Sequence, residues 1–365
     1  MALFDVLMPV KNGEAFIERA IASVQAQTER DWRLLVLDHG STDGTAAIVD
    51  RLARQDRRIE RHVHEQAEGL AGLLNEGLQR LQAPFAMRMD ADDECVPQRM
   101  AWTRDTFHRH PGVAAVGGQA EAIDADGRRV GRLDNPCDRD ALTRRAMFRS
   151  VFVHPAMSLR TSAVVERGLR YGVSTFRRHD AASAALQVPN LAEDYLLFGE
   201  LALDGQLLNM PQTVLRYRMH PGGVSRQKYT AQLSVTAMVS RHLAGVVSRR
   251  AGLPAFDPAP FCSHAQTLFD VGDSTDYRDE YDRMHQVLSR AGGAWSRGEG
   301  ELRWRRVFVD RSAAGIAGRA ALRLADLPDR WEAMTVVHAV RRILRRKDRF
   351  ALDAHSAIAA EAAAK

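Results

Sequence analysis

Residues 85–94 read Phe-Ala-Met-Arg-Met-Asp-Ala-Asp-Asp-Glu, a short apolar run that ends in four acids within five positions. A short apolar run is typical of a buried strand. In an extended chain, side chains two positions apart point the same way, so Asp90 and Asp92 should project from one face of the strand end. Neighbouring carboxylates repel each other, and a divalent cation bound between them usually offsets this repulsion. The alternative is a solvated loop in which Asp92 or Asp93 caps a helix near Pro97.

The chain before this segment alternates between strand-like and helix-like patterns. Expected strands cover residues 3–8, 32–37 and 61–65, and each is followed by apolar residues at helical spacing. Such alternation builds a parallel sheet with right-handed crossovers. We therefore predict an α/β fold, a Rossmann-like, mostly parallel sheet flanked by helices, with residues 90–94 at the carboxyl edge where such sheets bind ligands.

Further along, the pattern predicts a helix from Pro97 to about His110 and strands at 113–116, 154–160 and 213–218. A second Asp-Ala-Asp-Gly, at 124–127, is interpreted as a hairpin turn because Asp-Gly favours such turns. Another helix should open at Glu193 and Asp194.

From about residue 228 the chain is expected to be mainly helical. Helical patterns cover 228–250, 277–291 and 330–350, and only 304–309 suggests a further strand. Residues 336–349 combine an apolar stripe with a dense basic face. This segment either lies on an anionic membrane surface or packs its stripe on the domain.

Composition bounds the class of protein. The 365 residues carry a net charge of +5 and a pI near 9.4, an excess too small to indicate a nucleic-acid partner. No stretch reaches the 18 or more apolar residues needed to cross a bilayer, and no signal peptide is recognisable. Three scattered cysteines favour a reducing compartment, so we expect a cytoplasmic protein, at most peripheral on the inner face of a membrane.

Seven segments, taken in order, resemble the family 2 nucleotide-sugar glycosyltransferases, inverting enzymes of GT-A fold. They are Met-Pro-Val-Lys-Asn-Gly at 8–13, Leu-Asp-His-Gly-Ser-Thr-Asp-Gly-Thr at 37–45, residues 69–77 ending in Asn-Glu-Gly, the Arg-Met-Asp-Ala-Asp-Asp segment at 88–93, His-Pro at 154–155, Glu-Asp-Tyr at 193–195, and Arg-Tyr-Arg-Met-His at 216–220 with Ser225. His39 departs from the family's second acid in that position. The Gln-x-x-Arg-Trp motif of processive synthases is absent, which favours a single transfer.

The resemblance implies a metal and a catalytic base. Mn²⁺ or Mg²⁺ would be held by Asp92, with His220 as a further ligand because imidazole suits manganese. Asp194 would act as the base that takes the acceptor's proton.

The resemblance also implies a set of donor-binding residues. Asp38 would accept a hydrogen bond from a base NH, which fits UDP or dTDP. Arg88 and Arg218 would contact phosphate, and Asp90 the ribose or a metal-bound water. The remaining donor-side residues are Pro9, Val10, Asn12, Asn75, Glu193 and Ser225.

These expectations define a domain plan and a function. Residues 1–226 would form the GT-A domain, with a nucleotide-binding part at about 1–95 and an acceptor-side part at about 96–226. Residues 227–365 would form a helical region that contacts the acceptor, a membrane surface or a second copy of the chain. The predicted enzyme moves a sugar from a nucleoside diphosphate sugar to a glycan or lipid-linked acceptor in surface polysaccharide assembly. The alternatives are an inactive sugar-nucleotide-binding scaffold and a nucleotidyltransferase.

Overall fold

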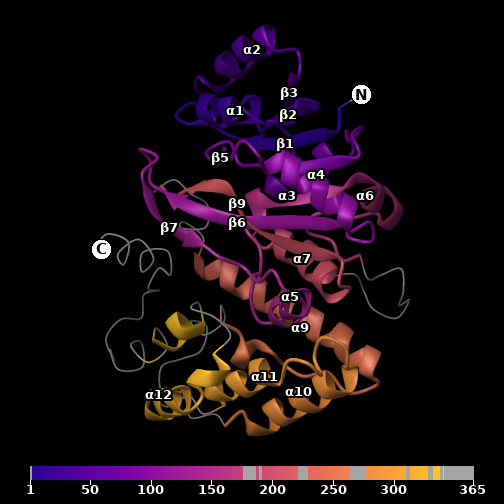
Figure 1. The fold of residues 1–365 in the computed structure, drawn as a ribbon, viewed down its shortest axis with the longest axis vertical. Coiled ribbons are helices and arrows are strands. Elements are labelled where there is room, and N and C mark those ends of the chain that lie inside the picture. The colour runs from indigo at the N-terminus through magenta and orange to yellow at the C-terminus, as the bar shows by residue number, and fades with distance from the viewer. Residues whose placement is uncertain are drawn as a thin grey trace. The chain divides into compact units, whose positions relative to one another are not determined.

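The computed structural model describes residues 2–175, 186–188, 191–220, 229–263, 276–309, 313–327, 332–337 and 340. The prediction for Ser225 and most of that for 336–349 fall outside these residues. The described residues form two compact units (Figure 1). The first takes the chain up to Cys137 and then Phe152 to Gly223, and the second takes Asp138–Val151 and the described residues beyond Val224. The division predicted at residues 226 and 227 stays a prediction.

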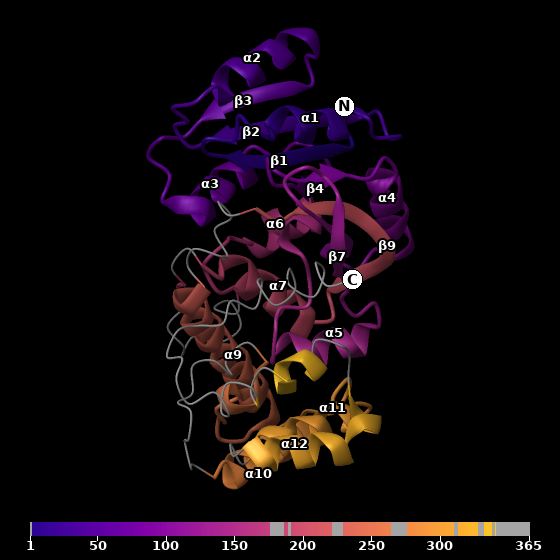
Figure 2. The same ribbon diagram turned by 90° about the vertical axis from the view of Figure 1, so that its left-hand side faces the viewer.

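The first half of the first unit is the predicted alternation of strands and helices. Its strands pair in parallel in the order β3-β2-β1-β4, which Figure 2 shows side by side. The elements are β1 (Phe4–Val10), α1 (Ile17–Gln25), β2 (Trp32–Asp38), α2 (Thr45–Gln55), β3 (Ile59–Val63), α3 (Gly69–Leu78) and β4 (Phe85–Arg88). All four carboxyl ends therefore open on one edge of the sheet.

Helices cover both faces of these parallel strands. On one face, Val6 and Met8 of β1 share a buried core with Ile21 of α1. On the other face, α3 comes so close that a Cβ on Gly77 would lie 2.7 Å from Leu37 Cδ1. Glycine permits that approach without any movement of the buried leucines of β1 and β2, which is consistent with the glycine that ends the Asn-Glu-Gly segment.

Beyond β4 the sheet becomes mixed. Within the described residues it has nine strands in the order β3-β2-β1-β4-β8-β6-β9-β5, with β7 paired to β6. The β6–β9 pair is parallel, and the pairs β4–β8, β6–β8, β6–β7 and β5–β9 are antiparallel. The added elements are β5 (Glu94–Cys95), α4 (Arg99–Arg109), β6 (Ala115–Ile123), β7 (Arg129–Leu133), η1 (His154–Ala156), β8 (Ser158–Arg160), α6 (Thr161–Arg167), α7 (Glu193–Leu203) and β9 (Leu207–Arg218).

Two local predictions can be compared with these elements. The turn at 124–127 joins the antiparallel strands β6 and β7, so the hairpin is confirmed. The single strand predicted over 154–160 is wrong in its first half, where η1 precedes the short β8. Pro155 lies in η1, and a proline cannot donate a hydrogen bond to a strand ladder.

The described residues of the second unit are helical. Its elements are α5 (Arg139–Ala146), α9 (Tyr229–Ala251), η3 (Ala259–Phe261), α10 (Arg278–Ala291), α11 (Glu299–Arg305), η5 (Arg306–Phe308), α12 (Ala313–Leu322) and η6 (Leu324–Asp326). The strand suggested at 304–309 is wrong. Trp304, Val307 and Phe308 are buried at helical spacing, three and four positions apart, and the short apolar run concealed that period.

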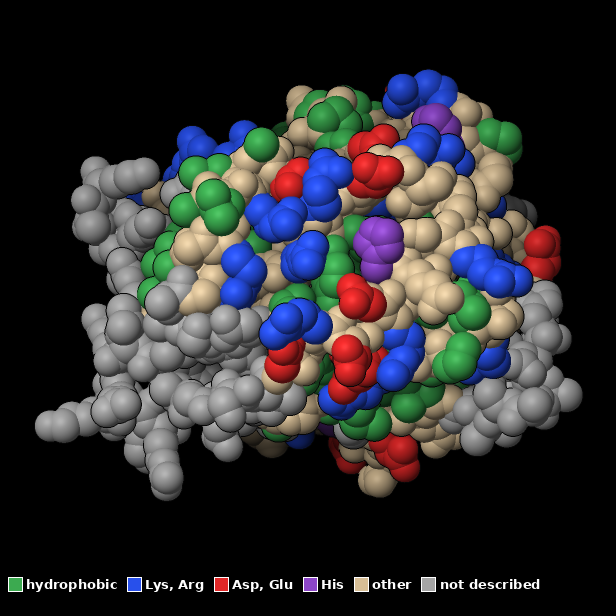
Figure 3. Space-filling view, turned by 90° about the horizontal axis from the view of Figure 1, so that it is seen from below, with side chains coloured by type: hydrophobic (Ala, Val, Ile, Leu, Met, Phe, Trp, Pro, Cys, Tyr) green, Lys and Arg blue, Asp and Glu red, His purple; other side chains and the backbone are tan. Residues whose placement is uncertain are grey.

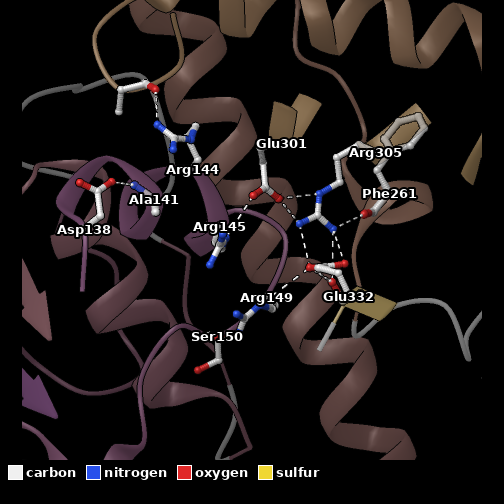
Figure 4. A network of polar contacts seen from close by, with 12 residues as sticks. Asp138, Ala141, Arg144, Arg145, Arg149, Ser150, Phe261, Glu301, Arg305 and Glu332 are labelled. Carbon is white, nitrogen blue, oxygen red and sulfur yellow. Dashed lines mark hydrogen bonds and ion pairs between the residues drawn. The ribbon is translucent and has the colours of Figure 1, made fainter. Parts of the chain in front are cut away.

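A buried ionic network joins helices within this unit (Figure 4). The guanidinium of Arg305, fully buried, lies 2.8 Å from Glu332 Oε1 and 3.0 Å from Glu301 Oε1 through its Nη2 and Nε. Arg145 of α5 reaches Glu301 Oε2 at 3.1 Å, and Arg149 lies 3.8 Å from Glu332 Oε1. Buried charges are tolerated only when paired in this way.

The described residues contain no helix that is both long and apolar enough to cross a bilayer. On the face drawn in Figure 3, acidic side chains lie among the basic and apolar ones. Charges of both signs are therefore mixed on this face.

Candidate active site

The acidic segment forms a loop between β4 and β5 at the carboxyl edge of the sheet. Ligand oxygens of Asp90, Asp92 and Asp93 all lie within 4.8 Å of one another. Asp90 and Asp92 are partly exposed, whereas Asp93 is buried. Neither Asp92 nor Asp93 caps α4, because Gln98 holds the position before that helix and makes no side-chain cap. The helix-cap interpretation is therefore wrong.

This loop concentrates negative charge in the way that a cation site does. Burial raises the pKa of Asp93 well above its ordinary value, and the charges of Asp90 and Asp92 add to the effect. Asp93 Oδ1 accepts a hydrogen bond from the backbone N–H of Arg218 at 2.8 Å. Its Oδ2 is buried and has no hydrogen-bond partner among the described residues. An unsatisfied carboxylate oxygen beside two further carboxylates fits a divalent cation.

The two predicted metal ligands lie side by side. His220 follows β9, and its Nε2 is 2.9 Å from Asp92 Oδ2. The ring of Phe16 packs against the imidazole with 5.1 Å between centroids. An imidazole and a carboxylate at this distance can bind the same ion, and this donor set suits Mn²⁺. Their roles as ligands stay predictions.

Arg88 places a buried positive charge at the end of β4. Its Nη1 lies 2.6 Å from Asp90 Oδ2, and its Nε has no hydrogen-bond partner among the described residues. Burial also raises the pKa of Asp90, and the charge of Arg88 opposes that rise. Arg88 thus retains a donor group that a ligand oxygen can accept from.

Asp194 lies in the first turn of α7. Its Oδ1 accepts a hydrogen bond from the Tyr195 backbone N–H at 2.7 Å, and its Oδ2 lies 3.6 Å from His154 Nδ1. Burial raises the pKa of Asp194, the charge of Arg88 lowers it, and Asp90 raises it further. The candidate base and the acidic loop therefore share one electrostatic environment.

Glu193 precedes the candidate base and is buried. Burial raises its pKa to about 7, and repulsion from Asp194 contributes to the rise. The charge on Asp194 therefore influences when Glu193 takes up its proton.

Sequence reasoning did not assign roles to His154 or Tyr171, which also lie here. Burial lowers the pKa of His154 well below its ordinary value and Arg88 adds to this, so the imidazole beside Asp194 is neutral. The Tyr171 ring packs on it with 5.3 Å between centroids. The His-Pro pair at 154–155 could have indicated a role for His154 from sequence, whereas no sequence pattern around Tyr171 indicates one.

The predicted base-binding residues lie around the ends of β1 and β2. Pro9 and Val10 are buried at the end of β1. Asn12 has a φ of 55°, and its side-chain Oδ1 accepts from the Thr42 backbone N–H at 2.8 Å, which joins the loops after the two strands. Asp38 is 2% exposed and lies 3.3 Å from Arg61 Nη1, a partner that the sequence did not suggest.

Two predicted donor contacts do not fit the structure. The side-chain amide of Asn75 binds the backbone of Tyr171 twice, through Nδ2 at 3.1 Å and Oδ1 at 2.9 Å. The side chain of Arg218 is fully buried and donates to the carbonyls of Asp92, Asp124 and Ala125. Both side chains are occupied by the protein, so they hold the scaffold in place of touching the nucleotide.

The chain is similar to known proteins in sequence and in fold. Residues 5–169 match the family described as glycosyl transferase family 2. A Haemophilus influenzae protein named "uncharacterized glycosyltransferase" is 24% identical over 243 residues, which are 64% of this chain and 71% of that protein. An Escherichia coli UDP-Glc:alpha-D-GlcNAc-diphosphoundecaprenol beta-1,3-glucosyltransferase, WfgD, is 36% identical over 98 residues, 27% of this chain and 38% of the relative.

Among solved structures, the crystal structure of S. aureus TarS 1-349 in complex with UDP-GlcNAc is similar in fold. The TM-score is 0.50 at 14% sequence identity, with 96% of this chain and 93% of that chain covered. Residues 5–169 are a glycosyl transferase family 2 domain, and the chain that carries it is a glycosyltransferase with a GT-A fold.

Proposed function

We propose that this enzyme transfers one sugar, with inversion, from a nucleoside diphosphate sugar to a hydroxyl of a glycan or lipid-linked acceptor, with a divalent metal as cofactor. The observation that carries the proposal is the cluster of carboxylates in the acidic loop at 90–93. His220 contacts Asp92 of this loop, and the charge of Asp90 raises the pKa of Asp194. The family match supports glycosyl transfer over the nucleotidyltransferase alternative.

The residues of the loop would hold the donor's diphosphate. Asp92 and His220, with Asp90 beside them, are the groups that would bind Mn²⁺ or Mg²⁺. Such an ion neutralises the charge that develops on a leaving diphosphate. The free Nε of Arg88 supplies a further positive contact for a phosphate oxygen.

Inversion requires a base on the opposite side of the sugar from the leaving group. Asp194 would accept the proton of the acceptor hydroxyl as its oxygen attacks the anomeric carbon, while the bond to the diphosphate breaks. Its raised pKa makes it a better proton acceptor than an exposed aspartate. The neutral imidazole of His154 lies beside it without a competing positive charge.

The donor and acceptor are proposed at the level of their class. Asp38, close to Pro9 and Val10 at the ends of β1 and β2, favours a uracil or thymine base, so UDP- or dTDP-sugars are the first donors to test. The E. coli relative acts on a diphosphoundecaprenol-linked sugar by its name, which supports a lipid-linked acceptor. The proposal places the enzyme in the cytoplasm or at the inner face of the membrane. Peripheral contact through 336–349 and self-association remain part of the proposal.

Nucleotide release tests the proposal. The enzyme is incubated with UDP- and dTDP-sugars, Mn²⁺, and either a polyprenyl diphosphate-linked GlcNAc or no acceptor. We expect acceptor-dependent release of UDP or dTDP and a product of inverted anomeric configuration by NMR. Folded protein that binds nucleotide but releases none with any donor or acceptor would favour the inactive scaffold.

A further inference from the structure

A single buried arginine connects the acidic loop to a turn far away in the sequence. The Nε of Arg218 donates to the Asp92 carbonyl at 2.8 Å, and its Nη2 pairs with the Glu94 carboxylate. Its Nη1 donates to the carbonyls of Asp124 and Ala125 at 2.9 and 3.0 Å. The guanidinium is therefore held between the acidic loop and the turn that joins β6 to β7.

The backbone of Arg218 makes a second attachment to the same loop. Its N–H donates to Asp93 Oδ1 at 2.8 Å. The guanidinium also lies 5.1 Å from the centre of the Phe16 ring, which in turn packs on His220. One residue thus contacts the Asp92 carbonyl, the side chains of Asp93 and Glu94, and a neighbour of the predicted imidazole ligand.

Arg216 reinforces the same link. Its Nη1 lies 2.7 Å from Glu94 Oε2, and its Nη2 donates to the Gly127 carbonyl at 2.6 Å. The turn therefore supplies backbone carbonyls to two arginines of β9, and both arginines reach Glu94.

The turn keeps its shape through the side chain of Asp124. Asp124 Oδ1 accepts from the backbone N–H of Asp126 at 3.0 Å and from that of Arg128 at 2.8 Å. Gly127 has a φ of 87°, which only glycine adopts without strain. Asp126 differs, because its side chain is 71% exposed and, within the described part of the chain, pairs only with exposed Arg128.

We propose that Arg218 is a positioning residue for the metal site and that the turn at 124–127, through Asp124, sets its position. This inference rests on the proposed metal-dependent function, since it assigns a role to residues that would not touch the ion. The Asp92 carbonyl and the Asp93 carboxylate are both fixed by Arg218, so the backbone that carries the Asp92 side chain is held where its carboxylate meets His220. Groups that orient metal ligands in this way typically change metal affinity 10–100-fold when removed.

The test compares two aspartates of the same turn. Asp124→Ala and Asp126→Ala remove the same charge, but only the first removes the hydrogen bonds that shape the turn. Mn²⁺ binding to the full chain without nucleotide is measured by electron paramagnetic resonance, with the unfolding midpoint recorded alongside. We expect Mn²⁺ affinity to fall on the order of tenfold in Asp124→Ala and to stay at the wild-type value in Asp126→Ala.

A third variant tests the arginine directly. Arg218→Lys keeps the charge and loses the fork of donors, so it should weaken Mn²⁺ binding on the order of 100-fold. Saturating Mn²⁺ should restore its nucleotide affinity, which a merely unfolded variant would not recover.

The outcomes separate this inference from the function on which it rests. Wild-type protein that binds Mn²⁺, with Asp124→Ala and Asp126→Ala binding it equally well, would overturn the positioning role and leave the metal site intact. Wild-type protein that binds no Mn²⁺ would overturn both proposals.

Discussion

Replacing Asp194 with asparagine removes the candidate base with little change to the surrounding structure. The asparagine oxygen can still accept the 2.7 Å hydrogen bond from the Tyr195 backbone N–H. The other contact, 3.6 Å from the neutral His154, is too long for a strong hydrogen bond. The variant should therefore fold and lose mainly its ability to accept a proton.

The size of the loss follows from the environment of the carboxylate. A positioned general base contributes roughly 10²–10⁴-fold in rate. Because burial raises the pKa of Asp194, it is a stronger base than an exposed aspartate. We therefore expect kcat to fall by about 10³–10⁴, which is about 4–5 kcal/mol in the barrier.

The assay is steady-state release of the nucleotide, with donor affinity measured separately by calorimetry. The variant should lose kcat and keep its donor affinity, because Asp194 acts only as the bond to the acceptor forms. An Asp194→Asn enzyme that retains more than one tenth of wild-type kcat would refute the assignment of the base.

Two further predictions concern pH and stability. A base must be ionised, so kcat/KM should fall as pH drops through the raised pKa of Asp194. The charge of Asp194 helps to raise the pKa of Glu193 to about 7, so Asp194→Asn should lower the pKa of Glu193 in an NMR titration of its carboxyl group, and an unchanged pKa would show that the two groups do not interact. Arg305→Met leaves Glu301 and Glu332 buried without their shared partner and should lower the free energy of unfolding by about 3–5 kcal/mol. In urea unfolding, Arg303→Met on the same helix, whose side chain is 50% exposed, should cost less than about 1 kcal/mol, and equal losses would contradict the burial argument.

The parts of this enzyme that sequence predicted are those set by neighbouring residues. The alternation of strand and helix up to β4 follows from local hydrophobic periods. The Asp-Gly turn at 124–127 and the start of α7 at Glu193 are equally local. The clustering of carboxylates in the acidic loop at 90–93 is local too, because these acids are adjacent in the chain.

The parts that sequence missed depend on distant contacts. The family resemblance implied that Arg218 contacts phosphate, but its side chain donates to the Glu94 carboxylate and to carbonyls about 90 to 130 positions away in the chain. The side-chain amide of Asn75 hydrogen-bonds the backbone of Tyr171, 96 positions away, and no local sequence pattern predicts such a contact. The strand order beyond β4 was also hidden, since β8, β6 and β9 pair out of chain order.

Calorimetry of nucleotide binding tests the central claim most directly. UDP, dTDP and GDP are titrated into wild type and Asp92→Ala, each with and without Mn²⁺. The account predicts that wild type binds UDP or dTDP only with Mn²⁺ and that Asp92→Ala loses this binding while remaining folded. Binding that is independent of Mn²⁺, or that survives in Asp92→Ala, would contradict a metal–diphosphate site on the acidic loop.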